Sequence, residues 1–94
     1  MATLALPAQL TLHQARAALE ALLQTLRGQM QTQTHCVCDA SALQVFDSSA
    51  LAVLLECRRA ALAAGRRFAM QGLPPALTGM AGLYGVQDLI QEPG

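Results

Sequence analysis

Residues 47–50, Asp-Ser-Ser-Ala, place a carboxylate and two hydroxyls next to one another where a helix is expected to begin. Such side chains accept hydrogen bonds from the free N–H groups of a first helical turn, so Asp47 or Ser48 is expected to be the N-cap. The alternative is a regulated hydroxyl. A phosphate on Ser48 would add about −1.5 to −2 charges, which the same N–H groups would partly stabilise. The residues alone leave both interpretations open.

The other reactive side chains form no pattern typical of a catalytic or metal site. His13 and His35 have no second ligand or nucleophile at a useful spacing, and a turn role explains Asp39 better than a carboxylate pair with Asp47. The three cysteines include no Cys-x-x-Cys pair, which argues against a zinc site and a disulfide framework. No glycine-rich phosphate loop is present. We therefore expect no catalytic residues, no metal ion and no cofactor.

Composition excludes several classes of protein. The chain has 94 residues, 53% of them apolar, and its six basic and six acidic side chains give zero net charge. It is too apolar to be disordered and has no basic surplus for nucleic acid. The first Arg, Arg16, comes too late for a signal peptide, and the apolar run 50–55 is too short to span a bilayer. We expect a cytoplasmic protein that neither binds nucleic acid nor inserts into a membrane.

Hydrophobic periodicity predicts strands and helices in alternation. A capping box of Thr11 and Gln14 predicts where the first helix begins, and Gly28 is a suitable stop. Residues 86–90 are expected either to add a last strand or to dock. Alternation of this kind predicts an α/β fold with a small mixed or parallel sheet. The expected strands are 3–6, 35–39 and 66–71, and the expected helices are 12–28, 47–65 and one that Pro74 and Pro75 open.

The predicted helix over 47–65 is apolar on two sides. One arc contains Val53, Leu54 and Cys57. A second arc contains Leu51, Leu55 and Leu62, with Arg58 at its edge. Either the two arcs face the sheet and a neighbouring helix, or the second arc docks a partner with Arg58 as a polar anchor.

Three segments together resemble a STAS domain: Asp39-Ala-Ser41, Asp47-Ser-Ser-Ala-Leu51, and Gln71-Gly72 after a helix that ends at Gly65. The specific part of the resemblance covers residues 39–90. With Met80-Ala-Gly-Leu-Tyr84 included, that part is similar to the small STAS subunit (MlaB-like) of the Mla phospholipid ABC transport system. Ala50 stands where most STAS domains carry Gly. The resemblance implies one STAS-like domain over residues 1–94, with helices packed mainly on one face of the sheet.

The resemblance also implies a function, that of a non-enzymatic protein-interaction module. In the MlaB-like branch, the module is a cytoplasmic accessory subunit that binds and supports the ATPase subunit, and the transporter holds it at the inner membrane. Among anti-sigma-factor antagonists, Ser48 would be the residue that a serine kinase phosphorylates, and the partner would be an anti-sigma factor. A homodimer formed through exposed leucines is a further alternative. The predicted partner surface consists of Asp47, Ser48, Ser49, Ala50, Leu51, Leu55, Arg58 and Leu62.

Overall fold

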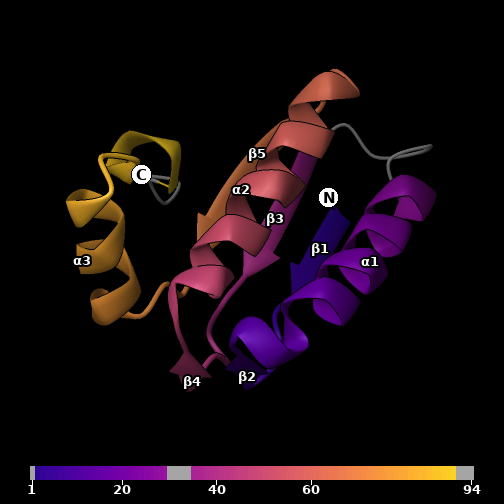
Figure 1. Cartoon of the computed structure of the whole chain (residues 1–94). Coiled ribbons are helices and arrows are strands. Elements are labelled where there is room, and N and C mark those ends of the chain that lie inside the picture. Colours follow the sequence, from indigo (N-terminus) through magenta and orange to yellow (C-terminus); the bar gives the residue numbers. More distant parts are fainter. Residues whose placement is uncertain (1, 30–34, 91–94) are drawn as a thin grey trace.

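The computed structural model describes residues 2–29 and 35–90, which form an α/β fold built on parallel strands (Figure 1). A sheet of three parallel strands has the order β1-β3-β5, and two shorter strands, β2 and β4, pair in parallel with each other. The strands are β1 Ala2–Ala5, β2 Gln9–Leu10, β3 His35–Asp39, β4 Val45–Phe46 and β5 Arg67–Gln71. The helices are α1 Leu12–Gln29, α2 Ser48–Ala63, α3 Pro75–Leu83 and the 3-10 helix η1 Gln87–Ile90.

Helices α1 and α2 lie side by side over one face of the three-stranded sheet, and α3 lies beside the sheet next to β5 and α2 (Figure 1). Strand register aligns Leu4, Cys38 and Met70 across β1, β3 and β5, and all three side chains are buried. They belong to a core that also contains buried leucines of α1 and α2. The predicted α/β class and the placement of helices mainly on one face are confirmed.

The predicted start of the first helix is confirmed at Thr11. The Thr11 backbone N–H donates to Gln14 Oε1 (3.0 Å), and the His13 N–H donates to Thr11 Oγ1 (3.3 Å), as in a capping box. Helix α1 continues to Gln29, one residue past the predicted stop at Gly28.

Helices α2 and α3 end in the same way. After α2, Gly65 has φ +74°, its N–H donates to the Leu62 carbonyl, and the Arg66 N–H donates to the Ala61 carbonyl. These bonds define a Schellman motif, which needs a left-handed residue and so favours glycine. Gly85, with φ +71°, repeats the motif after α3, where the Val86 N–H donates to the Ala81 carbonyl. The chain after each helix therefore turns back towards the core.

Apart from small shifts in the bounds of elements, the short strands differ from the sequence-based expectation. The two-residue strands β2 and β4 were not expected, because neither is long enough to show an alternating pattern. Of the two alternatives for residues 86–90, docking is confirmed: η1 forms there, and Ile90 is buried in the core. Within the described residues, no helix is both long and apolar enough to cross a membrane.

Candidate functional site

Asp47 joins the N-termini of the two large helices. It is half-buried, its Oδ1 accepts a hydrogen bond from the Ser49 N–H (2.8 Å), and its Oδ2 accepts one from the Leu12 N–H (3.0 Å). These two hydrogen bonds hold the pKa of Asp47 below its usual value, and the bond from the Leu12 N–H has the larger effect. The carboxylate is therefore ionised at neutral pH and occupied as the N-cap of α2, as the sequence predicted.

The two serines of the turn line different grooves. Ser48 is exposed and lies at a groove between α2 and the end of α3, here called the Ser48 groove. Ser49 is half-buried and lies at a groove between α1 and α2, here called the Ser49 groove. Ala52, one turn further along α2, lines both grooves. The start of α2 is thus a ridge between two surface depressions.

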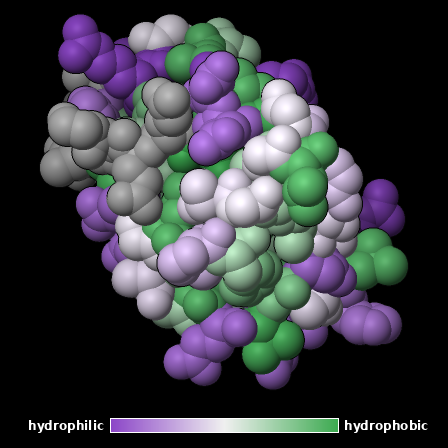
Figure 2. All heavy atoms as spheres, turned by 90° about the vertical axis from the view of Figure 1, so that its left-hand side faces the viewer, coloured by the Kyte–Doolittle hydropathy of each residue, from purple (hydrophilic) through white to green (hydrophobic). Residues whose placement is uncertain are grey.

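No charged side chain lines the Ser48 groove among the described residues. Besides Ser48, its lining residues are Leu51, Ala52, Leu55, Tyr84 and Val86. Tyr84 is 61% exposed, and its neighbour Leu83 is 89% exposed. Figure 2 views the side of the molecule on which α3 lies in Figure 1, where apolar and near-neutral side chains occupy the middle of the face and most hydrophilic ones lie towards its edges. Large exposed apolar side chains beside an uncharged groove are typical of a protein-contact surface.

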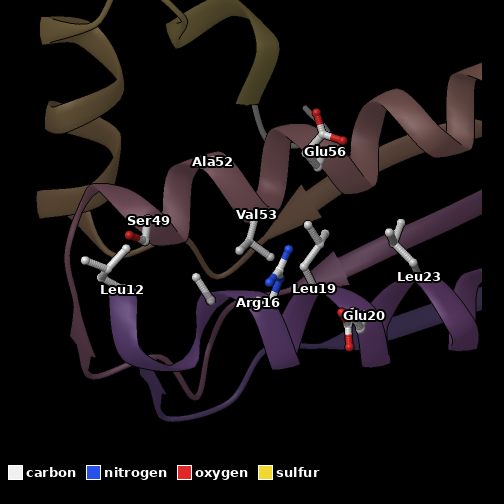
Figure 3. Close-up of a pocket in the computed structure, with 10 residues that line it drawn as sticks. Leu12, Arg16, Leu19, Glu20, Leu23, Ser49, Ala52, Val53 and Glu56 are labelled. Carbon is white, nitrogen blue, oxygen red and sulfur yellow. The ribbon is translucent and has the colours of Figure 1, made fainter.

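The Ser49 groove is larger and more mixed in character. Its volume is about 500 Å³, and Leu19, Leu23 and Val53 line its course. Figure 3 shows Leu12 and Ser49 beside each other at one end, with Arg16 pointing from α1 towards α2. Glu20 and Glu56 also line the groove, so it carries charges of both signs.

Only some of the residues predicted to form the partner surface are exposed together on the surface of the molecule. Ser48 is exposed, Leu62 is 46% exposed, and Leu55 and Arg58 are half-buried. Ala50 and Leu51, by contrast, are 0% and 4% exposed and belong to the core.

Leu51 is less accessible than the other leucines of the second arc. Of the two alternatives for that arc, docking a partner would need Leu51, Leu55 and Leu62 to be exposed together, but α2 lies between α1 and α3 and buries its first two turns more deeply than its last. Ala50 and Leu51 are therefore the least accessible residues of the predicted partner surface, although Leu51 still lines the Ser48 groove.

Sequence reasoning missed the contribution of α3 and of the turn at its C-terminus. Tyr84 and Val86 are more than 30 positions from Ser48 in the chain, yet they line the same groove. The signal that could have indicated them is Gly85, because a glycine directly after an apolar helix predicts a Schellman turn that returns the chain to the helix.

The groups at this site are suited to recognition. Among the residues that the structure describes, no group of three or more His, Cys, Asp or Glu side chains could hold a metal ion. The cysteines Cys36, Cys38 and Cys57 are free and buried, and burial raises the pKa of both Cys38 and Cys57 to about 12. Thiols held neutral in this way pack as small apolar side chains. The site itself offers a hydroxyl, a helix N-terminus and apolar surface.

Comparison with protein families gives a match over nearly the whole chain. The family described as "Mlab, STAS domain" matches residues 2–91. Comparison with curated proteins gives no match.

Proposed function

The chain belongs to the MlaB-like family of STAS domains, and from that membership we propose that it is the accessory STAS subunit of an ABC-type phospholipid transporter. STAS domains are generally protein-interaction modules without enzymatic activity. In the proposed role, the module binds the ATPase subunit of the transporter on the cytoplasmic side of the inner membrane. The binding supports assembly of the complex and its ATP hydrolysis.

The observation that carries the proposal is the exposed hydroxyl of Ser48 at the head of an uncharged groove. Interface cores are depleted in charged residues and enriched in aromatic ones, and Tyr84 supplies an aromatic ring next to the groove. The proposed partner surface consists of Ser48, Ala52, Leu55, Leu62, Leu83 and Tyr84, with Arg58 as a polar anchor at its edge.

Exposure of Ser48 also favours a second candidate, an anti-sigma-factor antagonist that a serine kinase switches by phosphorylation. A kinase needs the hydroxyl to be accessible, and the first turn of α2 offers N–H groups that would partly stabilise a phosphate. The Asp47 carboxylate on the preceding residue would repel that phosphate. The lipid-transport role needs no such modification.

Affinity purification from the native host distinguishes the two roles. The chain would be produced in its own host with an affinity tag, and the proteins that copurify with it would be identified by mass spectrometry. The transporter role predicts an ABC ATPase subunit in stoichiometric amount, whose ATP hydrolysis falls when the chain is removed. Recovery of an anti-sigma factor instead, together with phosphate on Ser48, would contradict that role and support the antagonist.

A further inference from the structure

The second face of the three-stranded sheet carries no helix among the described residues. Along β1 and β5, buried residues such as Leu4 and Met70 alternate with exposed ones such as Thr3 and Gln71, so only one face packs against α1 and α2 (Figure 1). Parallel sheets are usually covered on both faces. This open face is therefore a candidate surface for another molecule.

Three rows of residues cross the open face, and the charge and polarity of the side chains differ from row to row along the strands. Strand register places His35 beside Arg67 in the first row and Thr3, Val37 and Ala69 in the second. The third row contains Ala5, Asp39 and Gln71. One end of the face is therefore basic or hydrogen-bond donating, the middle is small and mainly apolar, and the other end is acidic or amide.

The first and third rows lie at equal distances along the strands on either side of the middle row. His35 and Asp39 lie two residues before and two after Val37, and Arg67 and Gln71 are placed in the same way about Ala69. The Ser41 N–H holds the pKa of Asp39 below its usual value, so Asp39 is charged at neutral pH. Reversing the strand direction exchanges the basic row with the acidic row.

We propose that this face is self-complementary and binds a second copy of the chain, with the two sheets stacked face to face and their strands antiparallel. The two-fold axis lies between the sheets and runs across the strands. It brings His35 opposite Asp39 of the second copy and Arg67 opposite Gln71 of the second copy. A two-fold axis parallel to the strands would instead bring the basic rows of both copies together, which like-charge repulsion disfavours.

Side-chain size in the middle row suits close stacking. Thr3 is exposed, Ala69 is half-buried and Val37 is already buried, so little bulk separates the two sheets at this row. The face is only three strands wide, which makes the dimer a weak one, with a dissociation constant on the order of 100 μM. The surface lies on the opposite side of the sheet from α2, so a copy bound to a partner through the Ser48 groove keeps this face free. The inference does not depend on the proposed transporter role.

Sedimentation velocity over a concentration series tests the proposal with the whole chain. Wild type is expected to dimerise as its concentration rises to about 500 μM. Arg67→Glu places an acid opposite Gln71 and Asp39 of the second copy, and Gln71→Arg places two arginines opposite each other. Each substitution is expected to raise the dissociation constant at least about tenfold. The double variant places Glu at position 67 opposite Arg at position 71 of the second copy, so it is expected to recover most of the lost dimer affinity.

Arg27→Glu is the matched control, because it makes the same charge change at an exposed site near the end of α1 and away from the sheet. It is expected to dimerise like wild type. Circular dichroism checks that every variant is folded. A wild type that stays monomeric throughout the series overturns the proposal. So does a double variant no better than the single ones, or an Arg27→Glu variant as weak as Arg67→Glu.

Discussion

A single carboxylate connects the two helices that cover the sheet. Asp47 accepts one hydrogen bond from the first turn of its own helix, at Ser49, and one from the first turn of α1, at Leu12. The chemistry that sequence analysis assigned to this residue, capping of the following helix, is confirmed. The bond to Leu12 could not be predicted, because it spans 35 residues and depends on how the two helices pack.

Substitution of Asp47 should have a pH-dependent effect on stability. The pKa of Asp47 is lowered in the folded state, so its stabilising effect is present above the unfolded-state pKa of about 4 and is lost as pH falls through the folded-state value. Asp47→Ala is expected to lower the thermal unfolding midpoint at pH 7, and the gap to wild type should narrow as pH falls below about 4. Asp47→Asn, which retains an N-cap acceptor, should fall between the two at pH 7. A gap independent of pH from 7 to 2 would contradict this role.

Gly72 shows a second constraint that acts at one residue. It follows β5 with φ +69°, and a Cβ atom there would lie 2.9 Å from the backbone nitrogen of Ser41. Sequence analysis placed Gly72 at the end of the strand 66–71 and in the family resemblance, but it could not indicate a close contact there. The physical reason for the glycine is the loop after β3, which passes against it.

Two glycine variants separate backbone strain from this steric conflict. Gly65 also has a positive φ, but a Cβ atom there would have nothing within 4 Å. Gly65→Ala should lower the free energy of unfolding by about 1–2 kcal/mol, the cost of a left-handed alanine. Gly72→Ala should lower it by more than about 3 kcal/mol, because the Ser41 backbone must also move. Urea unfolding measures both values, and equal losses would show that the close approach is unimportant.

For a whole element such as helix α2, hydrophobic periodicity predicts which sides are buried. Its two apolar arcs indicated burial on two sides, and the buried residues do come from both: Val53, Leu54 and Cys57 from one, Leu51 from the other. Periodicity could not indicate where along the helix the second side becomes exposed. That depends on α3, which covers the first turns and leaves Leu62 46% exposed.

The same leucine-to-alanine substitution can compare a buried position and an exposed position of α2. Leu54 is 0% exposed, and Leu54→Ala should lower the free energy of unfolding by about 2–5 kcal/mol through lost burial and a cavity. Leu62→Ala removes the same atoms from a partly exposed site and should cost less than about 1 kcal/mol. Chemical denaturation with guanidinium measures the difference. A loss at Leu62 as large as at Leu54 would mean that Leu62 supports the fold and not a partner surface.

Leu83, in the last turn of α3, belongs to the proposed partner surface and is too exposed to contribute much to the core. Leu83 is 89% exposed and directly precedes Tyr84, which lines the Ser48 groove, and Leu12 is 74% exposed at the Ser49 groove. Leu83→Ala should weaken binding of the ATPase subunit about tenfold, whereas Leu12→Ala should leave it unchanged. Surface plasmon resonance with the immobilised ATPase subunit compares them. Equal losses would place the partner on the other groove as well.

At the scale of the whole molecule, zero net charge makes local charge decisive. The described residues contain one salt bridge, Arg59 to Glu56 at 2.9 Å, on the exposed side of α2. The Ser48 groove itself has no charged lining residue in the described chain. One negative group introduced at Ser48 would therefore dominate the electrostatic field of the partner surface, beside an Asp47 carboxylate that is already ionised.

The most direct test of the proposed partner surface is the dissociation constant of the complex with the ABC ATPase subunit, measured by isothermal titration calorimetry for two charge variants. Ser48→Glu adds a negative charge at the head of the Ser48 groove. Thr25→Glu adds the same charge at an exposed hydroxyl position on α1. Ser48→Glu is expected to weaken binding at least about tenfold, and Thr25→Glu is expected to bind like wild type. Wild-type affinity in a folded Ser48→Glu variant would contradict it.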